Sequence, residues 1–285
     1  MAFPSALTVA GSDSGGGAGI QADLKVFTVL GVYGASVVTA VTAQNTLGVH
    51  AVEVLSPALV RAQLDAVLAD LDLQAVKTGM LGTPAVVQEV ARALRDRRLP
   101  LVVDPVMIAK GGHALLDPAA KVAVVRHLLP LALVVTPNLH EAGAITGLAI
   151  TSMEDMERAA RRLGELGPAW VVVKGGHLEG DAADLVWDGH TAAILRARRV
   201  DTRHTHGTGC SFAAAITAFL ARQDPVPRAI RRAKAFITRA IEHAPGLGSG
   251  HGPTNPMYWL GRECPEHLEE EEEHGPGPGC RPTAP

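Results

Sequence analysis

Aromatic side chains, cysteines and long apolar runs are all scarce in this 285-residue chain, and each scarcity excludes a class of protein. Only 4% of the residues are aromatic, so aliphatic side chains must build the core of a chain that is 47% hydrophobic. Three cysteines, at positions 210, 264 and 280, are too few and too scattered for a disulfide framework. No apolar run approaches the roughly 18 residues of a membrane span, so we expect no membrane partner.

Clusters of basic residues are also missing. The formal net charge is −3 at pH 7, and the isoelectric point is about 6.5. Binding to a nucleic-acid backbone needs clustered Lys and Arg, so we do not expect nucleic acid as a partner. The first residues, Met1 to Ser5, lack the cationic segment of a secretory signal, and we expect a cytoplasmic protein.

Short β-branched runs alternate with longer amphipathic segments through most of the chain. This alternation predicts an α/β fold with a mainly parallel sheet, helices on both faces and an antiparallel edge. The expected strands are 6–10, 35–41, 75–78, 101–103, 133–136 and 170–174, with a hairpin of 184–187 and 192–195 at the edge and a short strand 50–54 beside the sheet. The expected helices are 20–30, 57–70, 84–97, 119–129, 153–166, 211–222 and 227–243.

No linker interrupts this alternation, so we expect a single domain over residues 1–262. The remaining residues, 263–285, form a different kind of segment. They include five consecutive acids, Glu269 to Glu273, followed by a stretch rich in Pro and Gly. Such a composition cannot bury enough apolar surface to fold, so we expect disorder, either as a solvated extension or as an acidic interaction tail.

A glycine-containing turn stands directly before the expected helix 211–222. Gly207 and Gly209 flank Thr208, and Cys210 follows. Glycines let the backbone N–H groups converge, and the helix start adds partial positive charge to the same place. The segment therefore predicts an anion hole suited to phosphoryl transfer, although an ordinary glycine loop before a helix is the alternative.

The thiol of Cys210 has three possible roles. At a helix N-terminus its pKa should be lowered, which would make it a base for a substrate alcohol. It could instead be an inert small residue or a covalent nucleophile. An alternating strand would turn both His204 and His206 to one side near the thiol, but no third partner completes a nucleophilic triad.

Polar residues follow several of the expected strands, where parallel strands place their ligand-binding edge. Asp104 follows one strand and is either a loop anchor or, as we favour, part of a metal shell. Lys174 ends another strand and is either a phosphate contact or a solvated lysine at the sheet edge. Asn138 and Glu141 would share one face of a first helical turn. They suit either Mg²⁺ binding or a capping box, and local sequence favours the capping box.

The glycine-rich segment 11–19 follows the first strand. It lacks the Gly-Lys-Ser/Thr of a Walker A loop. A dinucleotide fingerprint can be fitted to residues 17–22, but the second strand ends in Gln44-Asn45 and offers no acid for a ribose, which disfavours an NAD oxidoreductase. Asp23 lies either near a small ligand or on a solvated helix surface.

Together these motifs resemble the ribokinase-like superfamily, and within it the hydroxymethylpyrimidine/phosphomethylpyrimidine kinases. The resemblance runs from about residue 6 to residue 260. Its carriers are Gly11-Ser12-Asp13-Ser14-Gly15-Gly16-Gly17-Ala18-Gly19, Ala43-Gln44-Asn45-Thr46, Lys77-Thr78-Gly79-Met80, Asp104-Pro105-Val106-Met107, Thr136-Pro137-Asn138 with Glu141, Lys174-Gly175-Gly176-His177 and Thr205-His206-Gly207-Thr208-Gly209-Cys210.

The resemblance implies a three-layer α/β/α kinase that uses ATP and Mg²⁺, and a homodimer. It assigns the pyrimidine site to Gln44, Gly11, Met80 and Val106, beside the Asp23 already considered. It assigns nucleotide binding to Lys174, Asn138 and Thr208, the metal shell to Asp104, Asn138 and Glu141, the anion hole to Gly207, Thr208 and Gly209, and the base to Cys210. A flap over residues 104–116 would close over phosphate. Pyridoxal kinase and a pyrimidine-binding regulator without activity are the alternatives.

Overall fold

Eight strands form one sheet in the computed structural model, which describes residues 3–107, 118–176 and 182–260. Their order across the sheet is β10-β9-β8-β7-β6-β5-β1-β2. The strands are β1 (Ser5–Ala10), β2 (Tyr33–Val38), β5 (Ala75–Thr78), β6 (Leu101–Val103), β7 (Val134–Val135), β8 (Trp170–Lys174), β9 (Ala182–Trp187) and β10 (Ala192–Ala197). Neighbours from β2 to β8 are parallel, whereas β8, β9 and β10 pair antiparallel. The predicted mainly parallel sheet with an antiparallel edge is confirmed.

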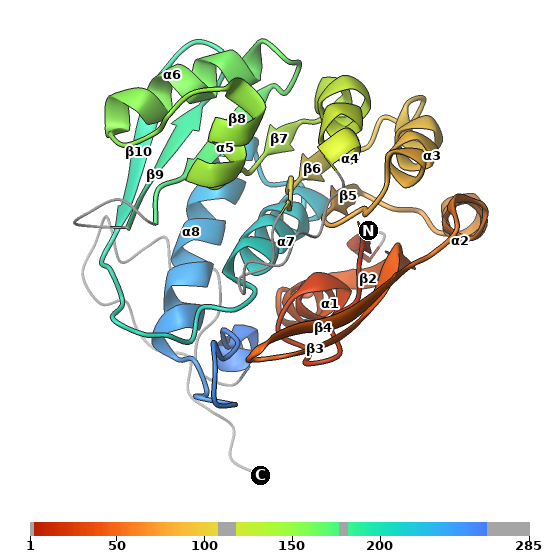
Figure 1. Ribbon diagram of the computed structural model, residues 1–285, viewed down its shortest axis with the longest axis horizontal. Helices are drawn as coiled ribbons and strands as arrows, with labels where there is room; N and C mark the ends of the chain where they lie inside the picture. The colour runs from red at the N-terminus through yellow and green to blue at the C-terminus, as the bar shows by residue number, and fades with distance from the viewer. Residues whose placement is uncertain (1–2, 108–117, 177–181, 261–285) are drawn as a thin grey trace.

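Helices cover both faces of this sheet (Figure 1). One face carries α1 (Gly19–Val29), α7 (Thr208–Ala221) and α8 (Val226–Glu242), with the 3-10 turn Pro256–Trp259. The other face carries α2 (Pro57–Asp70), α3 (Pro84–Leu94), α4 (Pro118–Ala123), α5 (Leu139–Thr146) and α6 (Met153–Gly164). Alternate residues of the strands feed the two apolar cores: Leu7 of β1 joins one and its neighbour Ala6 joins the other. The three-layer arrangement follows from this alternation.

The helices α2 and α3 begin in the same way, because each has a hydroxyl residue followed by proline at its start. Ser56 and Thr83 each cap a helix by accepting a backbone N–H, and a proline occupies the first helical position in both cases. The predicted helix 119–129 is less regular. Its second half widens into a π turn, Val124–Leu128, and then tightens into a 3-10 turn, Leu129–Leu131. No helix among the described residues is long and apolar enough to cross a membrane.

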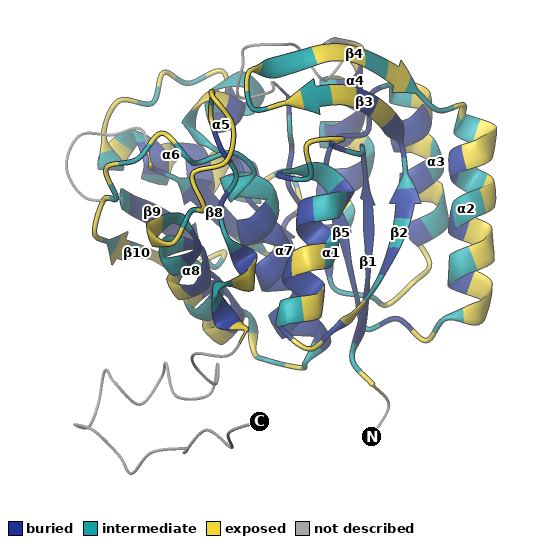
Figure 2. Ribbon diagram, turned by 90° about the horizontal axis from the view of Figure 1, so that it is seen from below, coloured by how far each residue is buried: buried dark blue, intermediate teal, exposed yellow. Residues whose placement is uncertain are grey.

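A separate two-stranded ribbon lies over the carboxyl ends of β1 and β2 (Figure 2). It consists of β3 (Ala40–Asn45) and β4 (Gly48–Val54), which pair antiparallel. The predicted strand 35–41 is therefore two strands. The strand 50–54, predicted beside the main sheet, is part of β4 in this ribbon. The break falls at buried Thr39, whose N–H donates to Ala10 O at 3.0 Å and whose hydroxyl donates to Met80 O at 2.6 Å.

Candidate active site

An ion pair between a partly buried lysine and a buried aspartate lies at the carboxyl ends of β6 and β8. Lys174 Nζ is 3.0 Å from Asp104 Oδ1, and the Thr136 hydroxyl donates to the same oxygen at 3.3 Å. The second oxygen, Asp104 Oδ2, is buried and is one of five such side-chain N or O atoms without a hydrogen-bond partner in the described part of the chain. A buried carboxylate oxygen without a partner is costly, so its persistence points to a ligand or cation that uses it.

The N-terminus of α7 faces this ion pair. A Cβ atom on Gly209 would lie 3.1 Å from Lys174 Nζ and 3.7 Å from Asp104 Oδ2. The helix begins at Thr208, three residues earlier than predicted, with Gly207 as its N-cap at φ 76°. The first N–H groups of a helix have no partner within it, so this turn offers donors beside the partly buried Lys174 cation. The structure thus brings together Gly207, Thr208, Gly209, Asp104 and Lys174, as the sequence predicted.

Cys210 lies in the first turn of α7 and is partly buried. Burial raises the pKa of its thiol to about 11; the Lys77 ammonium acts in the opposite direction, while the Asp23 and Asp104 carboxylates add to the rise. The predicted lowering of this pKa is therefore wrong. The helix N-terminus alone suggested a thiolate, but loss of water around the sulfur outweighs that contribution.

Asn138 and Glu141 form the capping box that local sequence favoured. The Asn138 side chain accepts from Glu141 N at 2.9 Å, and Glu141 Oε2 accepts from Asn138 N at 2.8 Å. Burial raises the pKa of Glu141 to about 7, Lys174 opposes that rise, and Asp104 adds to it. The electrostatic contacts place Glu141 close to the Asp104–Lys174 ion pair. The described residues contain no group of three or more His, Cys, Asp or Glu side chains that could hold a metal ion.

The residues assigned to the pyrimidine site lie just after β1, β5 and β6 and on the ribbon. A Cβ atom on Gly11 would be only 2.9 Å from Met80 Sδ, so these two residues are in direct contact. Gln44 lies half-buried on β3, and Val106 lies half-buried after β6. Most of the predicted flap, residues 108–116, lies outside the described residues, as does the tail 263–285.

Asp23 has neither of the two positions that the sequence allowed. It is completely buried, and Lys77 Nζ bonds both of its oxygens at 2.7 and 2.8 Å. The Thr8 hydroxyl donates to Asp23 Oδ2 at 2.6 Å. Burial alone would lower the pKa of Lys77, but the Asp23 carboxylate outweighs it and the pKa rises. Asp23 therefore neutralises a buried lysine beneath the site and does not face a ligand.

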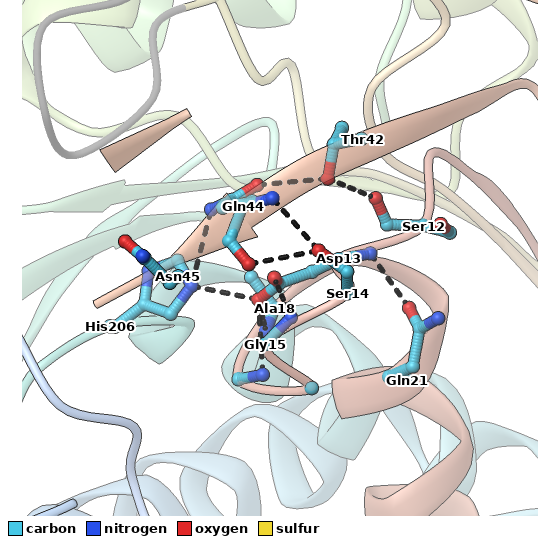
Figure 3. A network of polar contacts seen from close by, with 12 residues as sticks. Ser12, Asp13, Ser14, Gly15, Ala18, Gln21, Thr42, Gln44, Asn45 and His206 are labelled. Atoms are coloured by element: carbon cyan, nitrogen blue, oxygen red, sulfur yellow. Dashed lines mark hydrogen bonds and ion pairs between the residues drawn. The ribbon is translucent and has the colours of Figure 1, made fainter. Parts of the chain in front are cut away.

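One network at the site was not predicted (Figure 3). Asp13 Oδ2 lies 2.8 Å from His206 Nε2, which is also 3.3 Å from Gln44 Nε2. The Asp13 carboxylate also accepts three backbone N–H groups, those of Gly15, Gly17 and Ala18. The expected strand with His204 and His206 on one side is wrong, since His206 makes only an isolated bridge with Pro253. Because 193 residues separate Asp13 from His206, no local pattern could have revealed this network.

The sheet order, the antiparallel edge and the helix N-terminus facing the strand ends define a ribokinase-like α/β protein. The family model described as phosphomethylpyrimidine kinase matches residues 13–255, which includes nearly all of the described fold. The chain belongs to the phosphomethylpyrimidine kinase family.

Individual relatives agree with this assignment. The chain is 54% identical over 257 residues to the hydroxymethylpyrimidine/phosphomethylpyrimidine kinase of Rhizobium meliloti (strain 1021), which covers 89% of this chain and 97% of that one. It is 53% identical over 257 residues to the thiamine biosynthesis bifunctional protein ThiED of Geobacter sulfurreducens; the match covers 89% of this chain but only 52% of that protein, about half its length. The solved ADP complex of Bacillus subtilis pyridoxal kinase superposes with a TM-score of 0.84 at 41% identity, covering 90% of this chain and 98% of that one.

Proposed function

We propose that the chain phosphorylates 4-amino-5-hydroxymethyl-2-methylpyrimidine with ATP, and then phosphorylates the monophosphate to the diphosphate, as a kinase of thiamine biosynthesis. The observation that carries this proposal is the convergence of the Asp104–Lys174 pair with the N-terminus of α7 at one edge of the sheet. Phosphoryl transfer needs positioning and charge stabilisation more than covalent chemistry, and this arrangement supplies both.

For the nucleotide, we propose contacts from Lys174, Asn138 and Thr208. The Bacillus subtilis relative was solved as an ADP complex, which supports binding of a nucleotide by this fold. The unpartnered Oδ2 of Asp104 fits a share in a Mg²⁺ shell completed by Asn138, Glu141 and waters, since Mg²⁺ usually takes only one or two protein carboxylates. When bound, that ion would offset charge on the phosphates.

For the substrate, we propose that Gly11, Met80 and Val106 enclose the pyrimidine and that the Gln44 amide recognises its polar edge. An amide can both donate to and accept from a heterocycle. The N–H groups around Gly207, Thr208 and Gly209 would hold the charge of the transferred group. Cys210, in the same turn, would accept the proton of the substrate hydroxyl.

Replacement of Cys210 by alanine is expected to lower kcat by roughly 10²- to 10⁴-fold, the usual contribution of a general base, while the Kd for nucleotide stays unchanged. Since the pKa of the thiol is about 11, the thiolate is a small fraction at neutral pH. That fraction grows about tenfold per pH unit, so wild-type kcat should rise from about pH 7 to about pH 9. A steady-state pH profile of both proteins measures this; unchanged turnover in the variant would remove the base role.

The deciding experiment for the function is ADP release from MgATP with hydroxymethylpyrimidine, its monophosphate and pyridoxal offered in parallel. We expect turnover on both pyrimidines. A much higher kcat/KM for pyridoxal would favour a vitamin B6 kinase, to which the structural similarity with the Bacillus subtilis enzyme also points. Absence of turnover on all three, together with protection from unfolding by the pyrimidine alone, would favour a regulator.

We further propose a cytoplasmic homodimer. The ribbon β3–β4 exposes two large apolar side chains, with Val41 49% and Leu47 67% exposed. Exposed apolar side chains on a projecting ribbon suit contact with a second copy. Sedimentation equilibrium tests this, because a dimer would have twice the 29.7 kDa mass of the chain.

A further inference from the structure

The imidazole of His206 connects three segments that are distant in the sequence (Figure 3). Its Nε2 atom faces the Asp13 carboxylate of the first glycine loop and the Gln44 amide of the ribbon, while its own backbone leads directly into α7. The ring lies against Gly17 so closely that a Cβ atom there would be 2.6 Å from His206 Cδ2. The position of this ring is therefore well defined.

The proton between Asp13 and His206 lies on the imidazole, as the other contacts of Asp13 indicate. Asp13 accepts three backbone N–H groups, at 2.8, 3.0 and 2.8 Å, which suits an ionised carboxylate. Burial opposes this ionisation, but the His206 contact and the backbone donors outweigh it, and the pKa of Asp13 is lowered. An ionised carboxylate only accepts, so the 2.8 Å contact requires a proton on His206 Nε2.

The Gln44 amide lies between His206 and Thr42. A protonated His206 Nε2 is a donor, and it cannot accept from the Gln44 nitrogen placed 3.3 Å away. On the other side, Thr42 has one hydroxyl proton, which it donates to Ser12 O at 2.8 Å. Toward the Gln44 amide oxygen at 3.4 Å, the Thr42 hydroxyl can then only accept. The contact with His206 therefore places two donors together, and the contact with Thr42 places two acceptors together.

Both conflicts disappear when the amide oxygen and nitrogen exchange places, which leaves the shape of the side chain unchanged. The Gln44 oxygen then accepts from His206 Nε2–H, in a bond shared with Asp13, and the Gln44 nitrogen donates to Thr42. We propose that His206 and Thr42 lock the Gln44 amide in this orientation, which makes His206 a positioning residue for substrate selection. This rests on the proposed function of Gln44 as the residue that recognises the pyrimidine.

The locked amide keeps one N–H and one oxygen lone pair for a ligand. A 4-aminopyrimidine offers the complementary pair, an amino donor beside a ring-nitrogen acceptor. A 4-oxo analogue offers the reverse, an oxygen acceptor beside a ring N–H. To bind it, the Gln44 amide would have to rotate so that its oxygen and nitrogen exchange places. An amide without the contacts to His206 and Thr42 could rotate in this way. An amide held by them cannot, so the analogue should bind more weakly. A bidentate pair of this kind discriminates between ring edges by roughly ten- to hundredfold.

The test compares His206→Leu, which removes the donor, with His206→Gln, whose side-chain N–H can replace it. The measurement is kcat/KM for hydroxymethylpyrimidine and for its 4-oxo analogue, with the KM for ATP as a reference. We expect the preference for the amino compound to fall by about tenfold or more in His206→Leu and to be retained in His206→Gln. If His206→Leu slows both compounds equally, His206 only maintains structure and the proposal is overturned.

Two further measurements separate this proposal from the proposed function. Gln44→Ala should abolish the preference for the amino compound. If Gln44→Ala abolishes this preference but His206→Leu retains it, Gln44 recognises the pyrimidine without help from His206. In that case the positioning role of His206 fails and the proposed function stands. Neutron diffraction on the wild-type protein reports the amide directly, whether or not the protein turns over a pyrimidine. Deuterons on the Gln44 atom that faces Thr42 would support the proposal, and deuterons on the atom that faces His206 would overturn it.

Discussion

Alanine at position 207 is expected to reduce turnover by at least about 10²-fold and to lower the melting temperature. Gly207 caps α7 in the left-handed region, at φ 76°, and a Cβ atom there would lie 1.7 Å from Gly17 O. The two backbones must separate to admit it, which moves the N-terminal turn of α7 away from the Asp104–Lys174 pair. Loss of a single donor from an anion hole already costs roughly 10²- to 10³-fold in kcat.

The matched control for this prediction is Gly147→Ala. Gly147 ends α5 at the same φ of 76°, but a Cβ atom there would meet nothing within 4 Å. The Gly147→Ala variant should lose about 1 kcal/mol of its free energy of unfolding, because alanine is strained in the left-handed region, and its kcat should be unchanged. Steady-state kinetics and thermal unfolding of both variants check the comparison. Equal losses of kcat in the two would mean that the contact with Gly17 does not hold the anion hole in place.

Replacement of Lys77 by methionine is expected to lower the free energy of unfolding by about 3–5 kcal/mol. The change removes the cation and leaves the Asp23 carboxylate fully buried with only the Thr8 hydroxyl as a side-chain partner in the described structure. Proteins of this kind are stable by only about 5–15 kcal/mol, so this single change would threaten folding at physiological temperature. Urea unfolding measures the loss.

Two controls test whether the unpaired charge of Asp23 causes the loss of stability in Lys77→Met. The double variant Lys77→Met with Asp23→Leu removes both charges and should regain most of the lost stability, because a buried ion pair adds little over apolar packing. Arg61→Met removes one partner of an exposed pair, Arg61–Asp65, and should cost no more than about 1 kcal/mol. A double variant as unstable as Lys77→Met would show that the packing of the lysine side chain, and not its charge, stabilises the fold.

The pattern of the sequence predicts most of the fold because local chemistry determines it. The apolar strands Ala75–Thr78, Leu101–Val103 and Trp170–Lys174 and the helix Pro57–Asp70 begin and end where predicted. The break within residues 35–41 was missed because Thr39 is β-branched like Val37 and Val38 before it. The bond of its hydroxyl to Met80 O joins residues 41 apart in the sequence, so no local pattern could reveal it.

At the site, the sequence predicted which residues lie at the edge of the sheet, but it did not predict how deeply they are buried. It placed Asp104, Lys174 and the turn before α7 at one edge, since the ends of parallel strands must meet there. It misjudged Cys210 and Asp23 because the pKa of the first and the position of the second depend on burial, which no local pattern reveals. The roles of the site residues in binding and catalysis stay predictions.

The ribbon β3–β4 and the first glycine loop are joined to residues from the far end of the chain, and this bears on how the protein is made. His206 bonds Asp13 across 193 residues, and the His251 and Gly250 N–H groups donate to Thr46. A ribosome releases the N-terminal segments first, so the loop and ribbon must wait for their partners until almost the whole domain has left the exit tunnel. Stalled nascent chains that end before residue 206 would therefore lack the contacts that join the glycine loop and the ribbon to the far end of the chain, even if their early strands had already paired.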